Sequence, residues 1–124
     1  MKLLLDTQIM LWWLLGDRRL RQETREQMAT TACPVSVASN WEVAIKHRLG
    51  KLSVDPITFR DRTLAAGASF LPIADAHAIE TGNLPGMHED PFDRLIIAQA
   101  RIEGLVAVSA DAIWSTYELA LRRP

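Results

Sequence analysis

The stretch HEDPFDRLIIAQARIEGLVAVSAD, residues 88–111, predicts a loop, a buried helix, a tight turn, a buried strand and a closing aspartate. Asp90 before Pro91 is a strong helix start, because aspartate accepts orphan backbone N–H groups and proline at the first helical position loses no hydrogen bond. We expect a helix over residues 92–103 with little polar face, ended by a left-handed cap at Gly104. The apolar run 105–108 predicts a strand buried on both faces of a parallel sheet.

The rest of the chain alternates short apolar runs with helical patterns. Strands are expected over 2–5, 34–37 and 69–73, with an edge strand over 118–121, and helices over 9–15, 18–29, 39–49, 56–66, 74–81 and 112–116. Such alternation predicts a three-layer α/β/α sandwich with a mostly parallel sheet. A ligand site is expected above the carboxyl ends of the strands.

Length and composition favour a single domain. The chain has 124 residues, of which 48% are hydrophobic, so residues 1–124 are expected to form one domain with a substantial core. The longest apolar run, residues 9–15, is too short to cross a membrane, and no signal pattern precedes it, so we expect a cytoplasmic protein. Cys33 is the only cysteine, which excludes an internal disulfide. A net charge of −1 argues against a broadly basic nucleic-acid coat.

Four acids from separate stretches, Asp6, Glu42, Asp93 and Asp111, each follow a predicted strand or lie near a predicted helix start. In a parallel sheet these positions converge. Carboxylates brought together repel one another and raise one another's pKa unless a cation neutralises them. Mg²⁺ or Mn²⁺ prefers such oxygen ligands, so we predict a divalent metal site with Asp6, Asp93 and Asp111 as ligands.

Helix capping is the alternative explanation for some of these acids. Ser39-x-x-Glu42 matches a capping box, and Asp90-x-x-Asp93 resembles one. An acid in a first turn also gains about 0.3–1 kcal/mol from the helix macrodipole. Neither Asp6 nor Asp111 is needed to complete a local motif, and this favours a joint site over capping alone.

Four segments carry a resemblance to a known family. They are LLLDTQ (3–8), SVASNWEVAIKHRLGKL (36–52), HEDPFDRLIIAQA (88–100) and VSAD (108–111), with DPFDRLIIAQA the most specific. Over nearly its whole length the chain resembles PIN-domain proteins, specifically the VapC-type toxin ribonucleases of type II toxin–antitoxin pairs.

The resemblance implies a metal-dependent endoribonuclease that uses Mg²⁺ or Mn²⁺. The acidic positions of the family fall on Asp6, Glu42, Asp93 and Asp111, and its supporting hydroxyls fall on Thr7 and Ser109. At the position of Ser109 the family more usually has threonine. Asp90 is either an additional acid or, as we favour, a cap. Water would attack the phosphodiester, leaving a 5′-phosphate and a 3′-hydroxyl. The implied partners are RNA, a cognate antitoxin and a second copy in a homodimer.

Several basic and aromatic residues are candidates for binding RNA or a partner protein. Lys46 and Arg94 are candidates for contacting RNA, although an ion pair with Glu42 four residues earlier is an ordinary role for Lys46. Arg48, Lys51, Arg60 and Arg62 are candidates for continuing an RNA path or for simple solvation. Trp12, Trp13 and Trp41 fit core packing or a protein partner better than base stacking. None of His47, His77 and His88 is predicted beside the acids.

Two other functions compete with the ribonuclease. One is a non-catalytic PIN-like interaction module in which the acids serve only as caps. The other is an aspartyl-phosphate enzyme, disfavoured because Gln8 stands where a second aspartate would be expected. Nucleotide binding is disfavoured because the sequence has no GxGxxG or GxxxxGK[ST] stretch.

Overall fold

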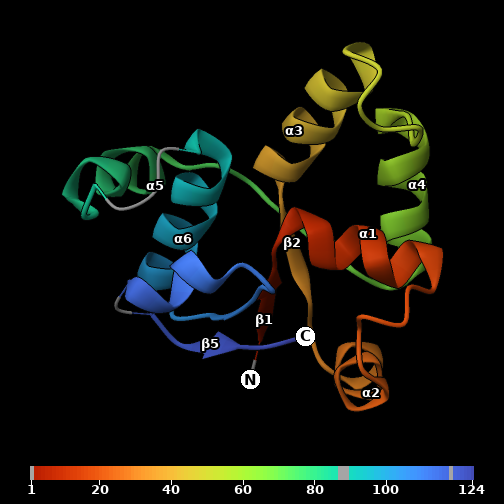
Figure 1. The fold of residues 1–124 in the computed structure, drawn as a ribbon. Coiled ribbons are helices and arrows are strands. Elements are labelled where there is room, and N and C mark those ends of the chain that lie inside the picture. Colours follow the sequence, from red (N-terminus) through yellow and green to blue (C-terminus); the bar gives the residue numbers. More distant parts are fainter. Residues whose placement is uncertain (1, 87–89, 118) are drawn as a thin grey trace.

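The computed structural model describes residues 2–86, 90–117 and 119–124. In these ranges short strands alternate with helices, as the sequence predicted (Figure 1). In chain order the elements are β1 (Leu3–Leu5), α1 (Thr7–Leu15), α2 (Gln22–Thr30), β2 (Pro34–Ser36), α3 (Val37–Arg48), α4 (Pro56–Ala65), β3 (Ser69–Leu71), α5 (Asp75–Glu80), η1 (Thr81–Asn83), α6 (Pro91–Glu103), β4 (Val106–Val108), η2 (Ala112–Thr116) and β5 (Leu121–Arg122). None of the helices described is long and apolar enough to span a bilayer.

β1 is the central strand of the sheet, although it comes first in the chain. The strand order is β3-β2-β1-β4-β5, and every neighbouring pair is parallel. The three residues of β1 align with the three residues of β4, and Leu5 also aligns with Val35 of β2. The carboxyl ends of the strands therefore share one edge, where β1 leads into Asp6 and β4 into Ser109.

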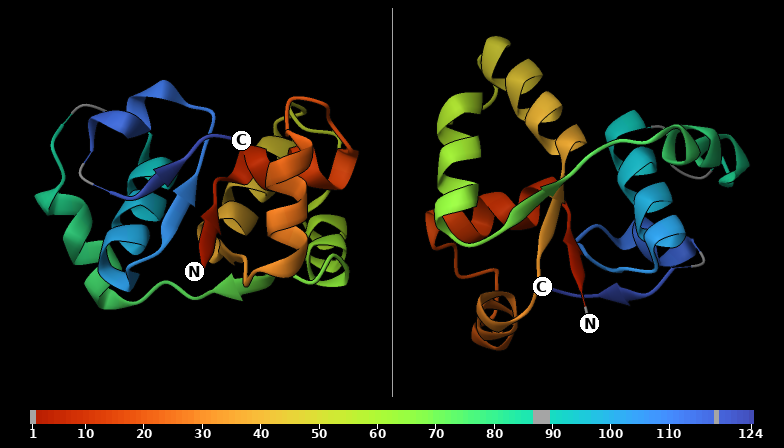
Figure 2. Two further views of the ribbon diagram at one scale, coloured as in Figure 1. Left: turned by 90° about the horizontal axis from the view of Figure 1, so that it is seen from below. Right: turned by 180° about the vertical axis from the view of Figure 1, so that it is seen from behind.

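Alternating side chains of β1 point into two separate cores. Leu3 and Leu5 pack with residues of α1, α2, α3 and α4, whereas Leu4 packs with residues of α6 and η2. Figures 1 and 2 show these two groups of helices on opposite faces of the sheet. The predicted three-layer α/β/α sandwich is confirmed, and the sheet is parallel throughout.

Local helix signals were reliable at α6 and at the end of α1. The Asp90 carboxylate accepts hydrogen bonds from the backbone N–H groups of Phe92 (2.9 Å) and Asp93 (3.2 Å), as an N-cap should. Gly104 ends α6 with φ 65° and Gly16 ends α1 with φ 66°, a left-handed conformation that only glycine adopts at little cost. The sequence predicted that α6 has little polar face and is largely buried. Ile102 departs from this prediction, because 43% of its surface is exposed.

Several predicted boundaries were wrong. α3 begins at Val37, not at Ser39, because Ser36 is the N-cap: its Oγ accepts from the Ala38 N–H at 3.0 Å. α2 begins at Gln22, not Arg18, and Asp17 does not cap it. The Asp17 carboxylate instead accepts from the backbone and side chain of Arg19. The edge strand begins three residues later and ends one residue later than predicted, and Glu118 lies outside the described residues.

Cys33, Trp12 and Trp13 pack against one core of the protein. Cys33 is buried, and burial raises the pKa of its thiol to about 11, which fits a structural role. Trp12 is buried and Trp13 is partly buried against the same core. Trp41 is the exposed member, with 56% of its surface accessible.

Candidate functional site

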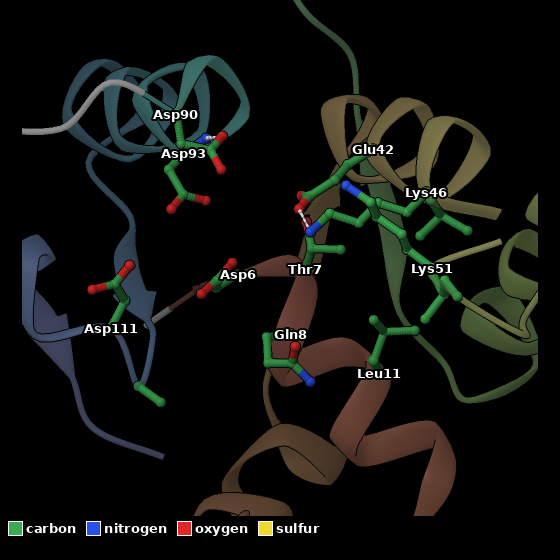
Figure 3. Close-up of a pocket in the computed structure, with 13 residues that line it drawn as sticks. Asp6, Thr7, Gln8, Leu11, Glu42, Lys46, Lys51, Asp90, Asp93 and Asp111 are labelled. Carbon is green, nitrogen blue, oxygen red and sulfur yellow. Dashed lines mark hydrogen bonds and ion pairs between the residues drawn. The ribbon is translucent and has the colours of Figure 1, made fainter. Parts of the chain in front are cut away.

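The four predicted acids line one cavity at the carboxyl ends of β1 and β4. The cavity has a volume of about 370 Å³ and lies between α3 and α6 (Figure 3). Its lining residues are Asp6, Thr7, Gln8, Leu11, Glu42, Val43, Lys46, Lys51, Leu52, Asp90, Asp93, Ala110 and Asp111. The structure thus brings together the acids from four separate segments, together with Thr7, Lys46 and Asp90.

Asp6 forms the floor of the cavity. Only 7% of its surface is exposed, and its Oδ2 accepts a hydrogen bond from the Ser109 hydroxyl at 2.9 Å. Burial, then repulsion from Asp93 and from Glu42, raises the pKa of Asp6 to about 7; the Ser109 hydroxyl and the Gln8 backbone amide oppose the rise. Asp6 occupies the N-cap position of α1, but its side chain makes no capping hydrogen bond there, and the influence of the Gln8 amide on its pKa is smaller than that of burial. Its position is therefore not explained by capping.

Two buried hydroxyls support this floor, at the positions the sequence indicated. Ser109 donates to Asp6, and its Oγ accepts from the Asp111 N–H at 3.1 Å, so one hydroxyl links the acids that follow β1 and β4. The hydroxyls of Thr7 and Ser39 are 2.7 Å apart and join the start of α1 to α3. Ser39 was considered only as a cap. Because α3 begins earlier than predicted, Ser39 lies inside the helix and faces α1.

Glu42 lies in the second turn of α3, where it cannot complete a capping box. Its side chain is only 7% exposed, and Oε2 accepts from Lys46 Nζ at 2.6 Å. This hydrogen bond is the main cause of the raised pKa of Lys46. Oε1 of Glu42 is buried and has no hydrogen-bond partner among the described residues. The predicted capping box at Ser39 was wrong, and the ion pair with Lys46 leaves one buried oxygen of Glu42 for another ligand.

The acids on the α6 side are attached to helix starts. Asp93 lies in the first turn of α6, and its Oδ2 accepts from Trp114 Nε1 at 3.4 Å. Asp111 is the N-cap of η2, and its Oδ1 accepts from the Ile113 N–H at 3.1 Å. Asp90 caps α6, as favoured from the sequence. In Figure 3 the carboxylates of Asp93 and Asp111 nevertheless turn towards the space above Asp6.

Arg94 does not join the cavity, although it follows Asp93. Its guanidinium donates to the carbonyl oxygens of Thr81 (2.6 Å), Pro85 (2.7 Å) and Leu84 (3.2 Å). Adjacent helical side chains point about 100° apart, so Asp93 facing the cavity directs Arg94 towards the segment before α6. In the structure Arg94 holds that segment, and its contact with RNA stays a prediction.

Of the remaining candidate residues, some line the cavity and others lie away from it. Lys51 lines the cavity, whereas Arg48, Arg60 and Arg62 do not. Among the described histidines, neither His47 nor His77 lines it, and His88 lies outside the described residues. Gln8 also lines the cavity, although no pattern in the sequence predicted a role for it there. Its position in the first turn of α1, two residues after Asp6, is the signal that could have identified it.

The cavity has the donor chemistry of a hard divalent cation. It contains a buried carboxylate with a raised pKa, Asp6, and a buried carboxylate oxygen without a partner, Oε1 of Glu42. Over residues 2–86, 90–117 and 119–124, however, no three His, Cys, Asp or Glu side chains are close enough to hold one ion jointly. The predicted ligand set of Asp6, Asp93 and Asp111 is therefore not preassembled. Mg²⁺ often binds one or two carboxylates directly and fills its other coordination positions with water. A preassembled set of three carboxylates is therefore not required.

Fold and cavity together define an α/β/α domain with an acidic ligand site at the carboxyl edge of a parallel sheet. Residues 3–118 match the family model described as PIN domain, and the chain belongs to the PIN-domain family. The resemblance seen in the sequence is confirmed at this level. No curated protein matches the sequence significantly.

Several solved structures are similar in fold. The VapBC2 complex from Rickettsia felis bound to a DNA fragment from its promoter matches with a TM-score of 0.77 and 16% identity, over 99% of this chain and 98% of that chain. A toxin–antitoxin complex from Klebsiella pneumoniae matches with a TM-score of 0.66 and 16% identity, over 96% and 94%. VapC20 from Mycobacterium tuberculosis, a Sarcin-Ricin loop cleaving toxin, matches with a TM-score of 0.67 and 16% identity, over 98% and 99%. At these identities the likeness establishes the fold.

Proposed function

We propose that this protein is a divalent-metal-dependent endoribonuclease and the toxin of a toxin–antitoxin pair. The observation that carries the proposal is the meeting of Asp6, Glu42, Asp93 and Asp111, from four distant segments, in one cavity. Membership of the PIN-domain family supports a nuclease. The fold shared with VapBC complexes and with an RNA-cleaving VapC toxin supports the ribonuclease and the antitoxin partner. We further propose that the protein works in the cytoplasm and forms a homodimer.

The residues have distinct proposed roles. Asp6, Asp93 and Asp111 would hold Mg²⁺ or Mn²⁺. When bound, the ion would supply water activation and neutralise charge on the phosphodiester. Glu42 would accept a proton from the attacking water at Oε1, which is buried and unpartnered, while Lys46 holds Oε2. Ser109 orients Asp6 through its hydroxyl. Attack at phosphorus breaks the bond to O3′, which takes a proton from solvent, leaving a 3′-hydroxyl and a 5′-phosphate.

A non-catalytic interaction module remains the competing function, and two observations favour it. Asp90 and Asp111 both accept hydrogen bonds from the N–H groups of the helices that follow them, as purely structural caps do. Asp6 and Glu42 argue the other way, because neither caps a helix and both are buried. Burying carboxylates without need is costly.

Glu42→Gln and Asp93→Asn separate the two functions. Both amides preserve size and hydrogen bonding but remove the negative charge. We expect each to lower metal-dependent cleavage of single-stranded RNA by about 10²–10⁴-fold, the range typical of a catalytic acid or base. Cleavage is measured on labelled RNA with Mg²⁺, with Mn²⁺ and with a chelator.

Asp61→Asn is the matched control, because Asp61 is an exposed carboxylate on α4 that pairs with its neighbour Arg60. It should cleave at the unmodified rate. If the unmodified protein shows no metal-dependent cleavage, or if Glu42→Gln and Asp93→Asn cleave as well as Asp61→Asn, the ribonuclease proposal fails.

A further inference from the structure

The lysines of this protein are placed unevenly. Of its 14 basic residues only three are lysines, Lys2, Lys46 and Lys51, and the last two both line the acidic cavity. No arginine lines it. Both lysines extend from the α3 side, opposite Asp93 and Asp111 (Figure 3). The cavity therefore has an acidic side and a basic side.

The turn after α3 fixes the position of Lys51. Gly50 has φ 73°, and this left-handed conformation reverses the chain. The Lys51 N–H donates to the Lys46 carbonyl at 2.9 Å, and the Gly50 N–H donates to the His47 carbonyl at 3.0 Å. The His47 ring then contacts the Leu52 carbonyl through Nδ1 at 3.0 Å. These bonds close the helix end and return Lys51 to the rim of the cavity.

The two lysines differ in what their charges already meet. Lys46 forms a 2.6 Å ion pair with Glu42, so its charge is shared with a buried carboxylate. Lys51 is exposed, and its ammonium group has no hydrogen bond or ion pair in the part of the chain that the structure describes. Lys51 is thus the cation of this cavity that is available to a ligand.

We propose that Lys51 binds a backbone phosphate of the RNA strand beside the bond that is cleaved, and so directs the strand along the α3 side of the cavity. The inference rests on the proposed ribonuclease function and deepens it. Asp90, Asp93 and Asp111 repel a polyanion from the opposite side, so a neighbouring phosphate is held best by an unshared cation across from them. Lysine serves as a point charge for phosphate and tolerates several strand positions.

The test measures binding separately from cleavage. Full-length Asp93→Asn protein is mixed with a fluorescent single-stranded RNA in Mg²⁺, and anisotropy gives the affinity at several salt concentrations. Adding Lys51→Ala should raise Kd about tenfold at ~50 mM salt and reduce the slope of log affinity against log salt by about 0.7, the value for one lost phosphate contact on single-stranded nucleic acid. Lys51→Arg should restore both quantities, because it restores the charge.

Lys2→Ala is the matched control, since Lys2 is an exposed lysine that lines a different cleft, away from the acids. It should leave affinity and slope unchanged. If Lys51→Ala matches Lys2→Ala in both, or if Lys51→Arg binds no better than Lys51→Ala, the assignment of Lys51 is overturned while metal-dependent cleavage by the unmodified protein still stands. If the unmodified protein neither cleaves nor binds RNA, the proposed function itself has failed.

Discussion

The α6 side and the α3 side of the cavity hold their carboxylates by different means. On the α6 side, Asp90 and Asp111 accept hydrogen bonds from backbone N–H groups, and Asp93 accepts one from the buried Trp114 indole. On the α3 side, Glu42 lies beyond the first turn, and one exposed lysine side chain is its partner. The first set is fixed by main chain and core, and the second depends on a flexible surface residue.

The carboxylates on the two sides therefore differ in how firmly they are held. The α6 side is preorganised, because helix starts stabilise negative charge without further help. The α3 side depends on Lys46, because this half-exposed side chain is the hydrogen-bonding partner of Glu42. Asp6 lies between the two sides and is repelled by both, more strongly by Asp93 than by Glu42. The following predictions test this contrast.

Asp6→Asn should have the largest effect on stability. The pKa of Asp6 is raised from 3.8 to about 7, so between these values the folded protein binds more protons than the unfolded chain. Stability in chelator should therefore fall as pH rises through this window, by up to about 4 kcal/mol at ~1.4 kcal/mol per pKa unit. Asp6→Asn carries no charge, so urea unfolding at pH 5, 6, 7 and 8 should show a flatter dependence and greater stability above pH 7.

The two sides can be ranked in the same experiment. Asp93→Asn should flatten the pH dependence more than Glu42→Gln, because Asp93 contributes more to the raised pKa of Asp6. Ser109→Ala should do the opposite and move the loss of stability to higher pH, since its hydroxyl lowers that pKa. Equal slopes for the unmodified protein and Asp6→Asn would contradict the raised pKa of Asp6.

Lys46→Met should have an intermediate effect. It keeps the aliphatic stem but leaves Oε2 of Glu42 buried without its donor, which costs about 1–2 kcal/mol in the free energy of unfolding. Adding Glu42→Gln removes the unpaired charge and should recover most of that loss. A double-mutant cycle from urea unfolding at pH 7 measures the coupling. Additive losses would show that Lys46 does not hold Glu42 in solution.

Asp90→Asn should have the smallest effect. Asparagine caps helices about as well as aspartate, so stability should change by less than about 0.5 kcal/mol, whereas Asp90→Ala should lose about 1 kcal/mol. If Asp90 is only a cap, Asp90→Asn should cleave RNA within about threefold of the unmodified rate, well short of the 10²-fold loss expected for a catalytic acid. A loss as large as that of Asp93→Asn would place Asp90 among the catalytic acids.

Sequence reasoning succeeded where the signal was local. The start of α6 follows from Asp90 and Pro91 alone, and the burial of β1 and β4 follows from their continuous apolar runs. The convergence of the four acids followed from one further rule, that parallel strands end at the same edge. The sheet order confirms that rule, because β1 and β4 are neighbours.

Sequence reasoning failed where the start of a helix or the position of a side chain depends on contacts with distant residues. α3 starts at Val37 because Ser36 both ends β2, paired with Leu71 of β3, and caps the helix. No motif within residues 34–42 reveals that pairing. Arg94 was placed at the site because it adjoins Asp93, but its carbonyl partners lie up to 13 residues earlier in the chain. Lys51 reached the cavity only through the reversal at Gly50.

The central position of β1 bears on when the acidic cavity can form during folding. Asp6 and its hydrogen-bonding partner Ser109 are separated by 103 residues, and Ser109 directly follows β4, the strand that pairs beside β1. A nascent chain lacking β4 has neither that partner nor a finished sheet. We therefore expect fragments that end before β4 to leave the acidic cavity unassembled.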